Sequence, residues 1–207
     1  MFGAAGSVGS RVMAEARSRG HSVTGVTRDA TRFPELRRGN AADVEDVIAL
    51  SRGQDLVISA TRPATGREAE LVTTTKAVLA GLAETGVRLL MVGGAASLTV
   101  PGTGTGTGTG TTVLDDPNLP PEIRAIAEAC DAQLAVCRAE TVADWAYLSP
   151  PALLEPGART GSYRLGRDEL IVDAEGNSTI SMEDLAVALL DEAERPRHRR
   201  TRFTVGY

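Results

Sequence analysis

Short apolar runs alternate with longer amphipathic stretches along the 207-residue chain. The amphipathic stretches predict helices, and the apolar runs between them predict strands. Helices are expected over residues 7–19, 43–52, 67–85, 121–138 and 181–194, and strands over residues 22–27, 36–38, 55–60, 88–93, 145–148 and 202–207. Because strands such as 89–92 are apolar throughout and lie between helices, they indicate a parallel sheet covered on both faces.

Three glycines, at positions 3, 6 and 9, stand directly before the first predicted helix. Glycine lets the chain turn sharply and approach a phosphate closely, and the first N–H groups of the helix would then face that anion. A turn, a helix and a strand in this order predict half of a dinucleotide-binding βαβ unit and disfavour an ordinary glycine turn. The loop residues expected to bind the pyrophosphate are Gly3, Ala5, Gly6, Ser7, Val8 and Gly9.

The order of elements predicts an α/β fold, a Rossmann-like doubly wound parallel sheet with helices on both faces. The length fits one domain, so residues 1–207 are expected to form a single NAD(P)-binding domain. Its C-terminal part, about residues 150–207, is predicted to be a small substrate-side segment. A hairpin of residues 162–165 and 170–173 is expected there, because Gly166 and Gly176 are turn signals.

The strand that should precede the glycine loop is short, because only Met1 and Phe2 stand before Gly3. A buried strand of about five residues is expected at this point. In a doubly wound sheet this first strand is central, so a truncated strand is expected to open the middle of the core. We therefore expect the natural chain to begin several residues upstream.

Thr27 and Arg28 end the second predicted strand, where the choice between NAD and NADP is made. A threonine does not repel a 2′-phosphate, and an adjacent arginine can pair with one through two hydrogen bonds. Asp29 follows and weakens this argument, and a plain surface role for Arg28 is the alternative. The sequence favours NADP(H) over NAD(H).

The carboxyl ends of the other parallel strands are expected to complete the cofactor site, because ligands bind at that edge of such sheets. The third strand would supply the adenine side, the fourth the wall beside the glycine loop, and the fifth and sixth the nicotinamide side. Small residues after the fifth strand would let the ring approach closely. These predicted residues are Asn40, Ala41, Ser59, Ala60, Thr61, Gly93, Gly94, Ser149 and Pro150.

Composition narrows the class of protein. The net charge of −5 argues against nucleic acid as a partner, and we expect the basic run 195–200 to be a solvated link into the last strand. There is no apolar run long enough for a membrane helix and no signal peptide, so a cytoplasmic protein without membrane contact is expected. Cys130 and Cys137 lie two helical turns apart, too far for a disulfide, and no metal site is predicted.

Residues 102–111 consist of alternating glycine and threonine. This segment has no apolar side chain to bury and has high backbone entropy, so a loop expanded by repetition is expected. Because the segment follows the fifth strand at its carboxyl end, a lid over the site is the functional alternative.

Several of these segments together resemble one family. The segments are residues 3–9, Arg28, 58–61, 92–98, 148–150 and 180–186. They resemble the NAD(P)H-binding atypical short-chain dehydrogenase/reductase family, whose relatives include NADH-flavin reductases, biliverdin reductase B and NmrA-like redox sensors. The resemblance covers nearly the whole chain and implies a Rossmann sheet, a bound NAD(P) and often a monomer. The chain departs from the family in its clipped first strand, in the Gly-Thr expansion and at Ala5, where threonine is usual.

The sequence lacks a recognisable acid–base pair. Classical short-chain dehydrogenases use Tyr-x-x-x-Lys, but the one lysine here, Lys76, has Val72 four residues before it. His21 and His198 are expected at the solvated surface. Ser97 and Tyr163 are left as candidate proton donors, and for both a loop or packing role is the alternative.

Because the sequence lacks a recognisable acid–base pair, we expect an acceptor that needs no acid catalyst. A flavin takes a hydride and draws its proton from water, so the protein would supply position and a dry pocket. We therefore predict an NAD(P)H-dependent oxidoreductase that reduces free flavin or a similar small conjugated acceptor. The alternatives are a non-catalytic NADP(H) redox sensor acting on a partner protein and, third, a sugar-nucleotide epimerase. A monomer or a homodimer is expected.

Overall fold

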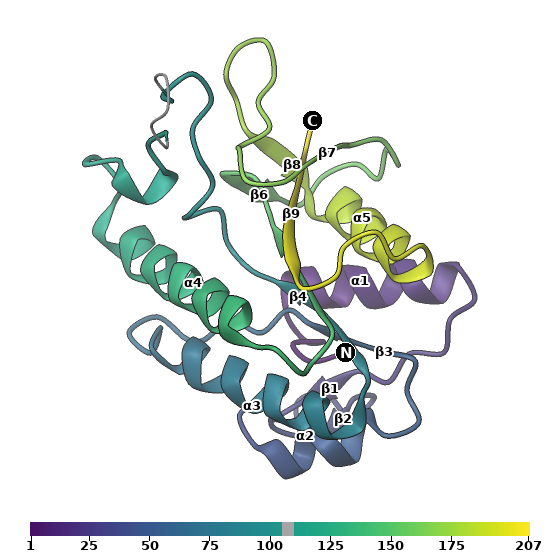
Figure 1. Ribbon diagram of the computed structural model, residues 1–207. Coiled ribbons are helices and arrows are strands. Elements are labelled where there is room, and N and C mark those ends of the chain that lie inside the picture. Colours follow the sequence, from purple (N-terminus) through teal and green to yellow (C-terminus); the bar gives the residue numbers. More distant parts are fainter. Residues whose placement is uncertain (105–109) are drawn as a thin grey trace.

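The computed structural model describes residues 1–104 and 110–207, and one sheet runs through its middle (Figure 1). The strands of this sheet are β1 (Val26–Thr27), β2 (Arg37–Arg38), β3 (Leu56–Ser59), β4 (Arg88–Val92), β5 (Trp145–Ser149), β7 (Arg164–Gly166) and β9 (Thr201–Gly206). Their spatial order is β2-β1 and then, beyond Phe2, β3-β4-β5-β9-β7. All pairs are parallel except β7 with β9, so the predicted Rossmann-like fold is confirmed with an antiparallel edge strand added.

Phe2 occupies the central position of the sheet. It forms parallel bridges to Val26 on one side and to Ser59 on the other. Its N–H donates to the Ile58 carbonyl at 2.9 Å, and its carbonyl accepts from the Ala60 N–H at 3.1 Å. Because Phe2 is also 3% exposed, the short first strand closes the middle of the core, and the expected opening is absent from the described part of the chain.

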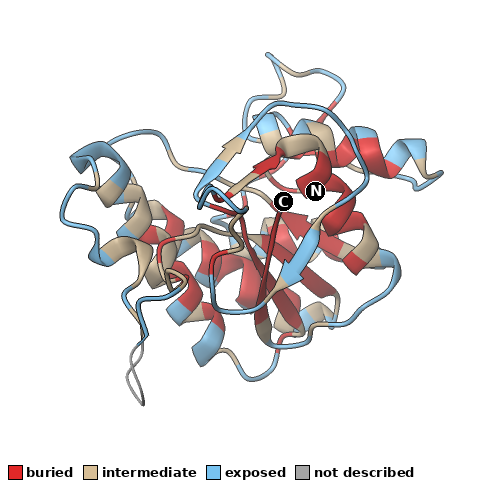
Figure 2. Ribbon diagram, turned by 90° about the horizontal axis from the view of Figure 1, so that it is seen from above, coloured by how far each residue is buried: buried red, intermediate tan, exposed pale blue. Residues whose placement is uncertain are grey.

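Helices cover both faces of the sheet, and Figure 2 shows the buried residues concentrated between them. The helices are α1 (Ser7–Ser18), α2 (Val44–Ser51), α3 (Glu70–Thr85), α4 (Pro121–Ala139) and α5 (Met182–Glu194), with a short 3-10 helix η1 (Val113–Asp115). α1 and α5 pack together over one face, and α2, α3 and α4 cover the other. Asp43 caps α2, and Ser181 caps α5, because its hydroxyl accepts from the Asp184 N–H.

The C-terminal segment differs from its prediction. The expected hairpin is wrong, because β7 pairs antiparallel with β9 and not with residues 170–173. A separate parallel pair, β6 (Leu153–Glu155) with β8 (Thr179–Ser181), was not predicted. Gly176 does lie in a turn, which Asp173 and Asn177 close by hydrogen bonds.

The structure describes the two ends of the Gly-Thr segment, residues 102–104 and 110–111. The Val100 N–H donates to the Thr111 carbonyl, and the Thr111 N–H donates to Thr103 Oγ1. Thr99 and Thr112 form an antiparallel bridge just outside these bonds. Residues 105–109, on which the lid hypothesis depends, lie outside the described residues.

Candidate cofactor site

The glycine loop is packed closely against the end of β3. Gly3 has a φ of +77°, and a Cβ atom there would lie 2.3 Å from the Ala60 carbonyl oxygen. A Cβ at Gly9 would lie 2.1 Å from the Gly3 carbonyl oxygen. A side chain at Gly3 would push the loop away from the strand, and one at Gly9 would push the loop away from α1, so glycine is required at both positions.

The N-terminus of α1 is left open to a ligand. Gly6 is its N-cap residue, no side chain caps it, and its first turn contains no acidic residue. The first N–H groups of a helix have no partner within the helix and carry the positive end of its dipole. This helix end is suited to an anion such as a pyrophosphate.

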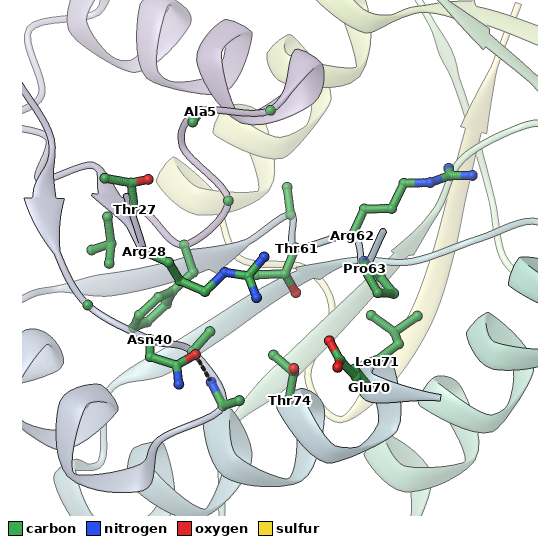
Figure 3. Close-up of a pocket in the computed structure, with 18 of the residues that line it drawn as sticks. Ala5, Thr27, Arg28, Asn40, Thr61, Arg62, Pro63, Glu70, Leu71 and Thr74 are labelled. Atoms are coloured by element: carbon green, nitrogen blue, oxygen red, sulfur yellow. Dashed lines mark hydrogen bonds between the residues drawn. The ribbon is translucent and has the colours of Figure 1, made fainter. Parts of the chain in front are cut away.

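A cavity of about 500 Å³ opens in front of this loop (Figure 3). It is bounded by the glycine loop, by the carboxyl ends of β1, β2 and β3, and by the start of α3. Of the residues predicted to bind the cofactor, the cavity brings together Gly3, Ala5, Gly6, Thr27, Arg28, Asn40, Ala41, Ala60 and Thr61. Four separate segments of the chain therefore meet at one site, as the strand-end rule requires.

The cavity wall carries an excess of positive charge. Arg28 is exposed, lines the cavity and makes no ion pair among the described residues. Arg62 also lines it, and in Figure 3 its guanidinium points away from Arg28. Arg67 pairs with Glu70, so the acidic group of the wall is already neutralised.

Asn40 holds the loop after β2 in shape. Its side-chain oxygen accepts from the Ala42 N–H at 3.1 Å, the bond drawn in Figure 3. Its own N–H donates to the Asp46 carboxylate at 2.8 Å. The side-chain nitrogen Nδ2 of Asn40 has no hydrogen-bond partner among the described residues, and Asn40 lines the cavity.

Part of the wall was not predicted from the sequence. The residues concerned are Phe2, Val26, Gly39, Ala42, Arg62, Pro63, Arg67, Glu70, Leu71, Thr73 and Thr74. Most of them follow Thr61 directly or lie on the first turns of α3. The signal was available in principle, because a helix that follows a parallel strand begins at the same sheet edge as the strand ends.

The other predicted cofactor residues do not line this cavity. Ser7, Val8 and Gly9 form the first turn of α1 behind the loop, and Ser59 is buried in β3. Gly93 and Gly94 follow β4, and Ser149 and Pro150 end the neighbouring strand β5. Ser149 is fully buried and its hydroxyl has no hydrogen-bond partner among the described residues.

The two glycines after β4 are explained by what lies beneath them. A Cβ at Gly93 would lie 1.8 Å from Cζ of Tyr147, and one at Gly94 would lie 2.8 Å from the Cys130 Sγ. The space beside these glycines is thus filled by Tyr147 of the strand β5 and by Cys130 of the helix α4. Burial raises the pKa of the Cys130 thiol to about 11, and the positive charge of Arg62 on the cavity wall opposes this shift.

The two candidate proton donors are held in hydrogen bonds outside the cavity. Ser97 Oγ accepts from Arg202 Nη1 at 2.9 Å. The Tyr163 hydroxyl donates to the Asp191 carboxylate on α5 at 2.7 Å. Burial and this bond raise the pKa of Tyr163. The structure therefore places neither residue among those that line the cavity.

The histidines and cysteines lie away from the cavity. His21 is exposed and contacts Glu194, whereas His198 is half-buried, stacked on Phe203 and bonded to Glu192, so its predicted solvation is wrong. Cys130 and Cys137 are both free thiols. Among the described residues, no group of three or more metal-ligating side chains comes together, and no helix is long and apolar enough to cross a membrane.

Comparison with known proteins assigns the family. A family model described as NAD(P)H-binding matches residues 3–196. The chain therefore belongs to this NAD(P)H-binding family, the atypical short-chain dehydrogenase/reductase family that its motifs resemble. The glycine loop, the open helix end and the basic cavity wall fit a dinucleotide cofactor.

Individual relatives are similar over almost their full length. YwnB of Bacillus subtilis, an uncharacterised protein, is 37% identical over 211 residues, which cover 99% of this chain and 96% of YwnB. The crystal structure of a candidate epimerase from Bacteroides thetaiotaomicron is 37% identical, covers 100% of this chain and 94% of that chain, and has a TM-score of 0.87. A candidate NADH-flavin reductase from Streptococcus pneumoniae is 29% identical, covers 99% and 96% of the two chains, and has a TM-score of 0.85.

Proposed function

We propose that this protein binds NADPH in preference to NADH and reduces a free flavin or a similar conjugated acceptor. The observation that carries the proposal is the cavity that runs from the open N-terminus of α1 to the guanidinium of Arg28, which makes no ion pair within residues 1–104 and 110–207. The first would bind the pyrophosphate and the second the 2′-phosphate.

The chain's own residues would act by position and exclusion. Bound NADPH supplies the hydride. Gly3, Ala60 and Thr61 would hold it against the end of β3, and Asn40 and Ala41 would border the adenine. The two candidate proton donors are held in other hydrogen bonds, Ser97 with Arg202 and Tyr163 with Asp191, and the sequence has no Tyr-x-x-x-Lys pair. An acceptor that is protonated by water after it takes the hydride fits such a site.

The relatives support this proposal unequally. The candidate NADH-flavin reductase shares the fold over nearly its whole length. The candidate epimerase is more similar in sequence, but the Tyr-x-x-x-Lys pair cannot exist in this chain. The position of Lys76, exposed on the outer face of α3, gives an epimerase no support.

The test is the absorbance decay of NADPH on addition of FMN, with NADH run in parallel. We expect saturable oxidation that is faster with NADPH. The reductase function would be rejected if the folded protein binds NADPH but does not oxidise it when any flavin or quinone is added. That result would favour the sensor, since binding without turnover is its signature.

We also propose the cytoplasm as the site of this activity. Free thiols such as those of Cys130 and Cys137 are typical of a reducing compartment. Fractionation of the native source organism, with detection by antibody, tests this proposal. Recovery of the protein outside the cell membrane would reject it.

A further inference from the structure

The loop that follows β4, residues 93–98, is held from beneath at two points by buried polar side chains. Tyr147 on β5 and Arg202 on β9 are partners in the register of these parallel strands, so their side chains lie side by side on one face of the sheet. Tyr147 is fully buried and Arg202 is 5% exposed. Both side chains form a hydrogen bond with the loop 93–98.

The first point is Gly94. Its N–H donates to the Tyr147 hydroxyl at 3.3 Å, while the ring of Tyr147 fills the space beneath Gly93. The hydroxyl in turn contacts the Cys130 carbonyl at 3.1 Å and Gln133 Oε1 at 3.0 Å. The position of the Gly94 amide therefore depends on one buried phenol.

A buried polar chain ties this phenol to the cavity wall. Gln133 Nε2 donates to Thr75 Oγ1 at 3.2 Å, and Thr75 Oγ1 donates to the Leu71 carbonyl at 2.8 Å. Leu71 lines the cavity. Because buried polar groups are costly to leave unpaired, this chain resists distortion between the wall and the loop.

The second point is Ser97. Arg202 Nη1 donates to Ser97 Oγ at 2.9 Å, and Nε and Nη2 of the same guanidinium both donate to Asp168 Oδ1 at 3.0 and 2.6 Å. Asp168 also accepts a more distant contact from Arg138. The guanidinium is thus fixed at both ends, and the loop cannot move at Ser97 without breaking a charge-assisted bond.

We propose that Tyr147 and Arg202 are positioning residues, a two-point clamp that sets the loop 93–98 in the shape needed for hydride transfer. The proposal rests on the proposed reductase function. It fits the place of the loop, because β4 is next to β3, whose carboxyl end forms the cavity wall. The clamp is needed for geometry and not for binding, since the adenosine end of the cavity is formed by other segments.

The test compares Tyr147→Phe and Arg202→Lys with wild type. Single-turnover hydride transfer from NADPH to FMN, the Kd for NADPH, and amide exchange over residues 92–98 are measured for each protein. We expect transfer to slow about tenfold or more while the Kd changes by about twofold or less, because a small misplacement affects the rate more than binding. Exchange over the loop should become faster.

Ser51→Ala is the matched control. Ser51 is fully buried on α2, and its hydroxyl bonds to Thr85 and to the Ile48 carbonyl, neither of which belongs to the loop or to the polar chain that holds it. Its loss is expected to lower the melting temperature without changing transfer or exchange over residues 92–98.

Two results would overturn the clamp. The first is an unchanged transfer rate in folded Tyr147→Phe. The second is a slower transfer that is fully accounted for by weaker NADPH binding or by a lower melting temperature. Absence of transfer in wild type, with every acceptor tried, would instead reject the reductase function. The exchange measurement then decides the clamp, since equal exchange in Tyr147→Phe and Ser51→Ala would reject it. Arg202→Lys gives the same comparison if Tyr147→Phe does not fold.

Discussion

At position 93, a Cβ atom would lie 1.8 Å from the ring of Tyr147. We expect Gly93→Ala to lower the free energy of unfolding by about 1–3 kcal/mol, the usual cost of an overpacked core. Combining it with Tyr147→Leu should cost less than the two single changes added together, because the smaller side chain makes room. Urea denaturation of the four proteins measures this coupling, and strictly additive losses would contradict the packing argument.

Arg28 carries the choice of cofactor. Arg28→Glu removes the cation and places a carboxylate near the 2′-phosphate, so we expect NADPH binding to weaken by about 10- to 100-fold and NADH binding by much less. Fluorescence titration with both nucleotides measures the two Kd values. Arg32→Glu, a change at an exposed arginine outside the cavity, is the control for net charge. Equal weakening for NADPH and NADH would reject the assignment of Arg28.

The case of Gly93 shows what sequence reasoning reaches at this scale. The small residues after β4 are predicted to let a nicotinamide ring approach closely, and the structure adds a second reason for glycine at position 93, because the ring of Tyr147 fills the space on its sheet side. Tyr147 is 54 positions further along the chain and no local pattern links it to Gly93. By contrast, Thr27 and Arg28 could be placed at the cavity because strand ends share one edge.

Among the elements, the connection between β6 and β7 is fastened across α1 and α5. Arg159 makes two bonds of 2.7 Å to Glu15 on α1, and the Gly157 N–H donates to Glu183 on α5. The bonds from Arg159, with those from Arg19, lower the pKa of Glu15 to about 2 although burial opposes the shift. The charged form of Glu15 is therefore favoured in the folded protein.

This contact predicts a pH dependence of stability. Because the pKa of Glu15 is lower in the folded than in the unfolded chain, its contribution is present above about pH 4.5 and is lost as the pH falls toward 2. We expect Glu15→Gln to be less stable than wild type at pH 7 by on the order of 1–3 kcal/mol and to approach wild type near pH 2. Urea denaturation at several pH values measures this, with exposed Glu122→Gln as the control. A constant difference from pH 7 to pH 2 would contradict it.

The helices and the central strands were predictable to within a few residues, whereas the C-terminal segment held two errors, the unpredicted pair β6–β8 and the partner of β7. The periodicity of α1, α3, α4 and α5 and the apolar runs of β3, β4 and β5 are local signals. The pairing of β7 with β9 joins segments about forty residues apart, and both strands satisfy the same alternation that a local hairpin would show. The sequence therefore indicates that 164–166 is extended but not which strand it meets.

For the whole molecule, the cavity is a product of topology. The predicted residues come from the glycine loop and from three strand ends, and the sheet order brings them to one edge. A ligand that spans this edge ties together segments that are otherwise joined through the core. Binding should therefore stabilise the entire fold and not one element.

We expect NADPH at about 100 times its Kd to stabilise the protein by about 2.7 kcal/mol. For a chain of this length each kcal/mol raises the melting temperature by about 2–4 °C, so the expected shift is about 5–10 °C. Differential scanning calorimetry with and without NADPH measures it. In Arg28→Glu the same NADPH concentration should give a clearly smaller shift, and an undiminished shift there would contradict the predicted role of Arg28.

The contact between Gly93 and Tyr147 also limits the routes by which this sequence can change over time. A larger residue at position 93 is tolerated only after position 147 has become smaller, whereas a smaller residue at 147 leaves room that position 93 can fill later. The first of the two substitutions therefore costs less stability in one order than in the other. A lineage that keeps the tyrosine keeps the glycine, and a library that randomises position 93 alone should return glycine from this background.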